Sequence, residues 1–271
     1  MDKRSKLIPS AWAVLINDWL ETLAASGLSE QTIRLRRAHV AKLSRAVACS
    51  PQSLSASALR KYLASGSWAA ETRRAMSASF KSFFSFIGRC ELAESLPRVK
   101  PAAPAPRPAP TDAYRQALQG ADKRVYLMLR LAAELGLRRG EIARLHIDDI
   151  GQDLLGEALS VHGKGKKIRC LPCSSELATL MRAAAGANGF IFPGSDNGHL
   201  SPNWVGKLIA AALPGKWTAH TLRHRFATRA YGSSDDLLAV SRLLGHASVA
   251  TTQRYIATDA SRLRQVVSLA A

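Results

Sequence analysis

Cysteine is scarce in this sequence of 271 residues, which contains only Cys49, Cys90, Cys170 and Cys173. So small a number excludes a disulfide-stabilised scaffold, and we expect the thiols to be reduced, as in an intracellular protein. Cys170 and Cys173 have the spacing of half a zinc site, but no second pair lies at a matching distance. Because their surroundings read as a β-strand, we interpret the pair as structural and predict no metal site.

Long apolar runs are also missing, since no stretch approaches the ~20 residues needed to cross a bilayer. The chain opens with the polar run Met-Asp-Lys-Arg-Ser-Lys, which lacks the apolar core of a secretory leader. These absences argue against a membrane protein and against a secreted one. We therefore expect a soluble protein of the cytoplasm.

Acidic residues are the third shortage. The 20 Asp and Glu stand against 38 Lys and Arg, which gives a formal net charge of +18 at pH 7. The first 100 residues hold 16 basic and 7 acidic side chains, so the excess is not confined to a basic tail. Such an excess predicts a polyanionic partner, with nucleic acid first and an acidic membrane surface second. The plainer alternative is a protein that is merely basic.

Apolar residues are plentiful, and their periodicity predicts an all-helical N-terminal region. Stripes at the i, i+3, i+4, i+7 spacing predict four helices, at residues 10–26, 29–47, 55–65 and 70–87. Four such helices form a small bundle, which we assign to residues 1–96. The last helix carries an aromatic stripe with the spacing of a buried face, so we interpret it as core and not as a base-stacking platform.

Basic residues gather off these stripes on the second and fourth helices. The set is Arg34, Arg36, Arg37, Arg73, Arg74 and Lys81. An ordinary solvated face is one explanation, but the clustering without balancing acids favours contact with DNA phosphates. Six prolines then crowd residues 97–110, which predicts an extended, semi-rigid linker between two domains.

Residues 111–271 read as a second domain. Helices are expected from a cap at Thr111 or Asp112, and over about 122–135, 174–185 and 201–212. Apolar and polar residues alternate on both sides of Gly163-Lys164-Gly165, the pattern of a β-hairpin with a lysine at its turn. Taken alone, such a lysine is more often simply solvated. The Asp148-Asp149 pair reads as a solvated loop.

A set of polar residues in this domain has the composition of a phosphoryl-transfer site. It consists of Arg138, Lys164, His220, Arg223, His246 and Tyr255. A tyrosine can attack a phosphodiester as a covalent nucleophile, while arginine forks and imidazoles hold the phosphoryl oxygens. Glu141 lies three residues after Arg138 and is placed to accept a hydrogen bond from it or from free N–H groups at a helix start. His220 and Arg223 are also three apart, so on a helix they share one face.

The order and context of these residues resemble the tyrosine recombinase (phage integrase) family. The contexts are Gly-Leu-Arg-x-x-Glu, Gly-Lys-Gly-x-Lys-x-Arg, His-x-x-Arg and Leu-Leu-Gly-His, followed by the tyrosine. The resemblance covers residues 111–255 strongly, and residues 10–95 in layout only. Gly140 and Ala219 stand where the family often has serine and proline, neither at a catalytic position. The implied fold is mainly α with a small β-hairpin or sheet: an N-terminal SAM-like core-binding bundle and a C-terminal catalytic domain.

The resemblance implies a role for each residue of the set. Tyr255 would attack the phosphate and form a 3′-phosphotyrosyl link, while the two arginines neutralise the non-bridging oxygens. His246 would donate a further hydrogen bond, and His220 would assist proton removal from the tyrosine. Lys164 is the candidate general acid for the leaving 5′ oxygen, although neighbouring lysines of the same run leave open which one reaches the scissile bond. Since side chains carry the charge, no metal, ATP or other cofactor is expected.

The resemblance also implies partners. These are double-stranded DNA with an inverted-repeat core site, a homotetramer on that DNA that exchanges strands through a Holliday junction, and an accessory DNA-bending or directionality protein. No membrane is involved, and the expected setting is the nucleoid of a bacterial host cell. The tail at residues 260–271 packs either in cis or on a neighbouring subunit; in the second case its deletion would spare site binding and weaken synapsis.

Several functions fit this chemistry. Integration or excision of a phage or mobile element is our first expectation, because the chain has no room before the bundle for the arm-binding domain of larger integrases. An Xer-type resolvase of chromosome dimers is the second. A type IB topoisomerase-like enzyme would relax DNA without site specificity, and a regulator that keeps the fold without catalysis would leave some polar positions unfilled.

Overall fold

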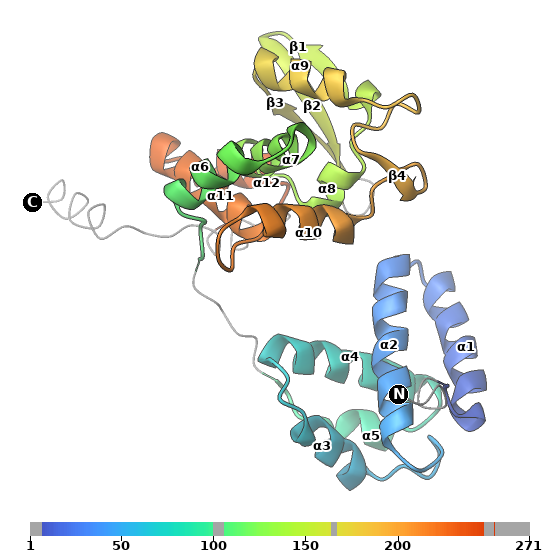
Figure 1. Cartoon of the computed structure of the whole chain (residues 1–271). Coiled ribbons are helices and arrows are strands. Elements are labelled where there is room, and N and C mark those ends of the chain that lie inside the picture. The colour runs from blue at the N-terminus through green and yellow to red at the C-terminus, as the bar shows by residue number, and fades with distance from the viewer. Residues whose placement is uncertain (1–6, 100–105, 164–166, 247–251, 253–271) are drawn as a thin grey trace, which may run out of the picture. The chain divides into compact units, whose positions relative to one another are not determined.

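The computed structural model describes residues 7–99, 106–163, 167–246 and 252 (Figure 1). Two compact units, Met1–Ala103 and Pro104–Ala271, divide the chain inside the proline-rich stretch. Both units are mainly helical and the second adds a small antiparallel sheet, which confirms the predicted fold class. Of the helices described, none combines the length and the apolar character needed to cross a membrane.

In residues 7–99, the first unit contains the four predicted helices and one more. They are α1 (Ser10–Ala25), α2 (Glu30–Ala46), α3 (Ala56–Ser65), α4 (Ala70–Phe86) and α5 (Cys90–Glu94). The side chains of Ser29 and Ser55 accept hydrogen bonds from the first turns of α2 and α3, as N-caps do. The extra helix α5 spans five residues, too few for a periodic apolar pattern to reveal it.

Aromatic residues form the core of this unit. Trp12 stacks on Phe83 with ring centroids 5.8 Å apart, and Trp19 meets Phe83 edge to face at 5.3 Å. Phe80, Phe83 and Phe84 of α4 are fully buried. The interpretation of the α4 stripe as core is therefore confirmed.

The second unit is built around α7. The helices described in the second unit are α6 (Thr111–Gly120), α7 (Lys123–Glu134), α8 (Arg139–Ala143), α9 (Ser175–Ala184), α10 (Pro202–Ala212), α11 (Ala219–Ser234) and α12 (Leu237–Leu244). Apolar residues bury α7 almost all round, and it packs against α9, α10 and α11. The cap of α6 is Pro110, so the prediction of Thr111 or Asp112 is wrong by one or two residues; Thr111 is already helical.

A three-stranded antiparallel sheet in the order β1-β2-β3 forms the second layer, with α9 packed on it (Figure 1). The strands are β1 (Ile150–Asp153), β2 (Gly156–His162) and β3 (Ile168–Pro172), and a short strand β4 (Pro193–Asp196) lies outside the sheet. The pairing of β2 with β3 confirms the predicted hairpin. Cys170 lies exposed on β3, and Cys173 follows the strand as a second free thiol.

The prediction that Asp148 and Asp149 form a solvated loop is right for Asp148 and wrong for Asp149. Asp149 is 9% exposed. Its carboxylate accepts from the backbone N–H of His146 at 2.9 Å and contacts Nε2 of His162 at 3.0 Å. This carboxylate caps a 3-10 turn, Ile147–Asp149, that leads into β1. Hydrogen bonding at the turn therefore explains its burial, while Asp148 stays exposed.

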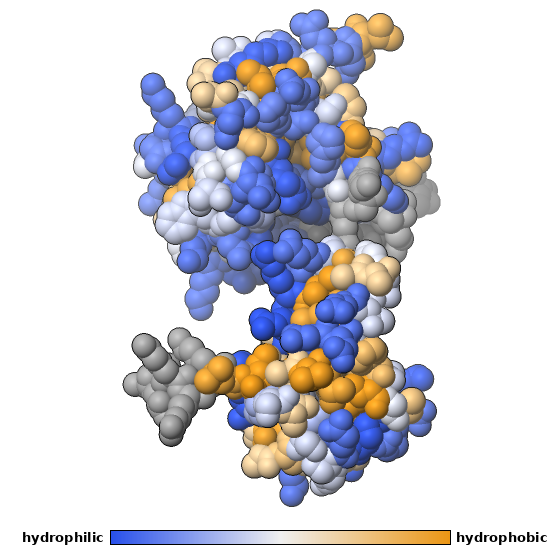
Figure 2. Space-filling view, turned by 90° about the vertical axis from the view of Figure 1, so that its right-hand side faces the viewer, coloured by the Kyte–Doolittle hydropathy of each residue, from blue (hydrophilic) through white to orange (hydrophobic). Residues whose placement is uncertain are grey.

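The surface is mostly hydrophilic on the face of the second unit seen in Figure 2. Leu154 and Leu155, at the turn between β1 and β2, are the most exposed large apolar side chains of the described chain. Most buried apolar residues of the unit gather in one core shared by α7, the sheet and α9 to α11, and a small separate cluster joins α11 to α12.

Candidate active site

Arg138 reaches the site because α7 ends just before it. Gly136 adopts a φ of +63°, and a Cβ there would lie 2.4 Å from the ring of Phe226, so both the turn and the packing require glycine. Arg138 follows this turn and is the N-cap residue of α8. Glu141 accepts from its backbone N–H at 2.8 Å and from its Nη1 at 2.7 Å.

Glu141 is the buried anion around which the cations of the site gather. Its side chain is 3% exposed and pairs with both terminal nitrogens of Arg169, at 2.9 and 2.8 Å. Nη1 of Arg223 lies 3.9 Å from the same carboxylate. Burial acts to raise the pKa of Glu141, but hydrogen bonds and charges from Arg169 and Arg138 outweigh it and hold the pKa at about 2. The carboxylate is therefore charged at neutral pH.

Arg223 is the most deeply buried cation of the site, with a side chain 1% exposed. It lies in the first turns of α11, where it donates to the carbonyl oxygens of Gly136 and, at 2.6 Å, of Leu244. Its Nη2 also lies 3.1 Å from Nε2 of His246. These partners come from the ends of α7 and α12, so the guanidinium ties both helix ends to α11.

His246 follows the left-handed residue Gly245, whose φ of +63° ends α12. Since a guanidinium can only donate, Nε2 of His246 accepts from Arg223, and the ring proton lies on Nδ1, 2.8 Å from Oγ1 of Thr252. Burial, followed by the charges of Arg223, Arg138 and Arg169, lowers the pKa of His246 to about 4. The imidazole is therefore neutral at neutral pH, and in this arrangement its Nε2 acts as an acceptor.

His220 stands at the start of α11, one turn before His224, and the two rings meet edge to face with centroids 4.7 Å apart. Partial burial, and then the charges of Arg223 and Arg138, lower the pKa of His220 below its ordinary value. A neutral imidazole at this place can accept a proton. His224 is itself 8% exposed and lies behind His220 in the helix.

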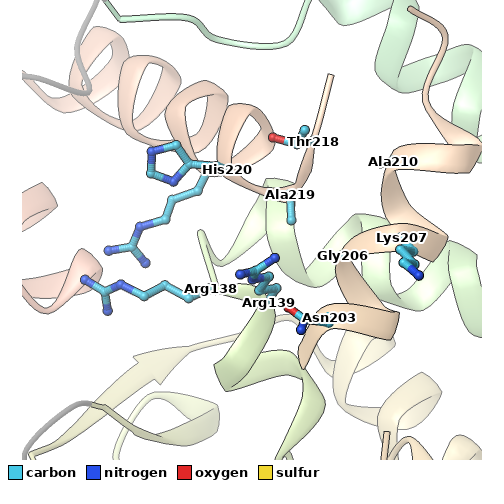
Figure 3. Close-up of a pocket in the computed structure, with 10 residues that line it drawn as sticks. Arg138, Arg139, Asn203, Gly206, Lys207, Ala210, Thr218, Ala219 and His220 are labelled. Carbon is cyan, nitrogen blue, oxygen red and sulfur yellow. The ribbon is translucent and has the colours of Figure 1, made fainter. Parts of the chain in front are cut away.

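A pocket of about 750 Å³ opens beside these residues. Its polar lining consists of Arg138, Arg139, Asn203, Lys207, Thr218, His220 and Arg223. Figure 3 shows Arg138 and His220 on one side of the pocket and Asn203 and Lys207, from α10, on the other. The charged residues of this lining are all cationic, so the pocket suits an anion with several oxygens. In the described part of the chain, no cluster of three or more His, Cys, Asp or Glu is arranged to hold a metal ion.

Four of the six predicted catalytic residues thus lie in one cluster: Arg138, His220, Arg223 and His246. Lys164 and Tyr255 lie outside the described residues. The hairpin that carries Lys164 is described up to Gly163 and again from Lys167.

The sequence pattern indicated no role for Arg169, although this residue lies in the Gly-Lys-Gly-x-Lys-x-Arg run. Strand alternation offered a hint, because Arg169 shares a sheet face with buried Leu171 two residues on. An arginine on the inner face of a strand needs a buried anion, and Glu141 supplies it.

The six candidate DNA-binding residues of the first unit are not equally available. Arg34 pairs with Glu30, and Arg74 contacts Glu71 at 3.1 Å, so the expectation that no acids balance the cluster is wrong for these two. Arg36 donates to Ser82 at 3.1 Å, which brings α2 against α4. For the others, Arg37 is exposed, while Arg73 and Lys81 are half-buried.

Comparison with known proteins places this arrangement in a family. A model of the phage integrase family matches residues 110–262. Tyrosine recombinase XerC of Azotobacter vinelandii is 35% identical over 210 residues, which cover 69% of this chain and 70% of that protein. XerC of Bradyrhizobium diazoefficiens is 34% identical over 198 residues, 66% of this chain and 60% of that protein, so the match spans less than two thirds of this relative.

Solved structures share the fold at lower identity. A lambda integrase dimer bound to a COC′ core site has a TM-score of 0.70 at 18% identity, covering 89% of this chain and 76% of that one. The XerH site-specific recombinase bound to its difH substrate has a TM-score of 0.66 at 21% identity, covering 90% and 80%. The chain belongs to the phage integrase family of tyrosine recombinases, enzymes that cleave and rejoin DNA.

Proposed function

We propose that this protein is a site-specific recombinase that cuts and rejoins DNA through a covalent bond between Tyr255 and a 3′-phosphate. The observation that carries the proposal is the cationic pocket, in which Arg138, His220 and Arg223 converge and Arg223 holds His246. An anionic phosphodiester with charge developing on its non-bridging oxygens fits such a pocket. Permanently charged guanidinium groups neutralise that charge without a metal ion.

In the proposed reaction, the attacking tyrosine loses one proton and the leaving 5′ oxygen gains one. The Tyr255 oxygen attacks the phosphorus and loses its proton, for which a neutral His220 is the acceptor. The bond from phosphorus to the 5′ oxygen breaks, and Lys164 donates a proton to that oxygen. The energy of the broken bond is kept in the phosphotyrosyl link, so the reverse attack by a 5′-hydroxyl rejoins DNA without a cofactor.

In this scheme, His246 helps to position Arg223. Its Nε2 accepts a hydrogen bond from Arg223 before DNA binds. The donor role expected from the sequence therefore requires a different hydrogen-bond arrangement once a phosphate enters the pocket. A lowered pKa keeps the ring neutral, so that it can accept or donate with little cost.

The DNA partner we propose is a duplex with an inverted-repeat core site. Within the second unit, Arg139 and Lys207 extend the pocket lining beyond the predicted catalytic residues, where phosphates flanking the scissile bond would lie. In the first unit, the basic set on α2 and α4 would contact the duplex backbone. A homotetramer at synapsis is supported by a solved structure of the same fold, a lambda integrase tetramer bound to a Holliday junction. An accessory DNA-bending or directionality protein completes the proposal.

For the biological role, the curated relatives named XerC favour an Xer-type function, the resolution of chromosome dimers in the bacterial cytoplasm. Integration or excision of a phage or mobile element, our first expectation from the sequence, is the second candidate. The two differ in the DNA site that the protein cuts.

Covalent trapping tests both levels of the proposal. The protein is incubated with nicked fragments of its own genome, denatured, and the attachment points of the protein-bound DNA are sequenced. We expect adducts at one short inverted repeat, and none with Tyr255→Phe. Scattered adducts would support a topoisomerase-like activity, and good DNA binding without adducts would support the regulator. The location of a single site, at the replication terminus or in an integrated element, decides between the two roles.

A further inference from the structure

Arg169 connects three elements of the second unit through one guanidinium group. It lies on β3, pairs through Nη1 and Nη2 with both carboxylate oxygens of Glu141 on α8, and donates from Nε to the carbonyl oxygen of Leu243 on α12 at 2.8 Å. Its side chain is 12% exposed. Because a guanidinium presents its N–H groups in a fixed planar fork, these bonds set the α8 carboxylate relative to the end of α12.

Through Glu141 on α8, Arg169 sets the position of Arg138. Glu141 has few orientations open to it, since Arg169 occupies both of its oxygens. The same two oxygens accept from the side chain and backbone of Arg138. Arg138 is otherwise 41% exposed at its side chain, so this shared carboxylate is its main anchor among the described contacts.

Through the end of α12, Arg169 sets the position of His246. Two successive carbonyls close α12, and each accepts from a different arginine: Leu243 from Arg169, and Leu244 from Arg223. Free carbonyls at a helix C-terminus carry partial negative charge, so cations are favoured there. The two arginines therefore fix the turn from which His246 projects.

Gly245 shows how closely Arg169 approaches that turn. A Cβ at this position would lie 3.0 Å from Cδ and 3.1 Å from Nη1 of Arg169, in addition to the strain of a φ of +63°. The turn before His246 thus has the shape it has partly because Arg169 lies against it. Strand β3, the second strand of the hairpin to which Lys164 belongs, therefore packs directly on the site.

We propose that Arg169 is a positioning residue for DNA cleavage: by joining Glu141 to the end of α12, it sets the places of Arg138 and His246 together. The inference rests on the proposed function, because these two residues matter for cleavage only if their pocket holds the scissile phosphate. The terminal nitrogens of Arg169 bind Glu141 and its Nε binds the Leu243 carbonyl, so Arg169 need not touch DNA. Loss of its fork therefore slows the chemical step and leaves DNA affinity in place.

The test compares Arg169→Lys with Arg130→Lys. Lysine keeps the charge but lacks the fork. Arg130 is a matched control: its side chain is 10% exposed, and its ion-pair partners in the described chain are Glu134 and Glu176, away from the predicted catalytic residues. Arg169→Gln is measured as well, so that one variant remains if the other does not fold. Each protein is incubated with a nicked duplex that carries the site identified by covalent trapping. Its Kd for this duplex and its rate of phosphotyrosyl formation at saturating duplex are then measured.

We expect Arg169→Lys to lose about 100-fold in the rate of phosphotyrosyl formation, because small misplacements of catalytic groups have effects of that size. Its Kd should change by less than about threefold, and Arg130→Lys should keep a near-normal rate despite a lower Tm. Added methylguanidinium should restore part of the rate to Arg169→Ala but leave Arg130→Ala unchanged. A merely structural arginine would show neither the split between rate and Kd nor this rescue.

Two results would overturn the positioning role: a normal cleavage rate in Arg169→Lys and Arg169→Gln, or equal losses in the Arg169 and Arg130 variants. Arg138→Ala separates this failure from that of the proposed function. If Arg138→Ala cleaves normally, the proposed site itself is wrong. If Arg138→Ala is inactive while the Arg169 variants cleave normally, only the positioning role is lost.

Discussion

Arg34 and Arg74 of the first unit differ from Arg169 and Arg223 of the second in burial and in the partners they bind. In the first unit, the side chains of Arg34 and Arg74 are 77% and 56% exposed and pair with glutamates one turn away on the same helix. In the second unit, those of Arg169 and Arg223 are 12% and 1% exposed and bind groups from distant segments. Equal formal charge therefore serves two purposes in one chain.

The difference has an energetic basis. An exposed pair on one helix contributes about 0.3–0.5 kcal/mol, so a DNA phosphate can displace the glutamate with little loss. A buried guanidinium is held by several acceptors at once and has no freedom to follow a ligand. We infer that the first unit supplies adaptable backbone affinity, while the second supplies a fixed geometry for chemistry.

The largest expected effect comes from breaking the buried side of this comparison with Arg223→Gln. We expect the rate of phosphotyrosyl formation to fall by about 1,000-fold, because a donor to the developing charge is lost. Unfolding in urea should show a loss of about 2 kcal/mol, because the carbonyls of Gly136 and Leu244 lose a partner. Arg225→Gln, also on α11 and 8% exposed, is the control and should keep the rate. Cleavage by Arg223→Gln within tenfold of the parent would contradict the assignment.

A second, intermediate effect concerns the anion that holds the buried arginines. The pKa of Glu141 is lowered from 4.5 to about 2, so its contribution to stability is fully present above pH 4.5 and is lost as the pH falls toward 2. That contribution amounts to about 3 kcal/mol. We therefore expect Glu141→Gln to be less stable than the parent at pH 7, with the gap closing between pH 4.5 and 2. Urea unfolding of both proteins across this range measures the gap, and a gap independent of pH would refute the charge network.

The smallest effect sharpens the exposed side of the comparison. Arg37 on α2 is exposed, and we expect Arg37→Gln to weaken DNA binding by about threefold to tenfold and to reduce the salt slope of log K by about 1. Stability should stay within about 0.5 kcal/mol. Arg115→Gln, with a side chain 73% exposed in the second unit, is the control. Equal salt slopes for Arg37→Gln and the parent would remove Arg37 from the DNA-contacting set.

Local features of the fold were predictable because neighbouring residues decide them. Ser29, Ser55 and Asp122 cap helices where the sequence places a cap before an apolar stripe. The turn at Gly136 and the pairing of Arg138 with Glu141 also depend on residues only a few positions apart. The missed elements α5, β1 and β4 are five, four and four residues long and carry too little periodic pattern to stand out.

Residue patterns were enough to predict most of the helices, the hairpin, the basic character and the family to which the ordered polar residues belong. How those residues are held depends on contacts that form only in the folded chain. Arg169 binds Glu141, 28 positions away, and Leu243, 74 positions away, and Arg223 binds Gly136, 87 positions away. No local pattern encodes such contacts, because they arise when packing of α7, the sheet, α11 and α12 brings remote backbone carbonyls and one buried carboxylate within reach of the same guanidinium groups.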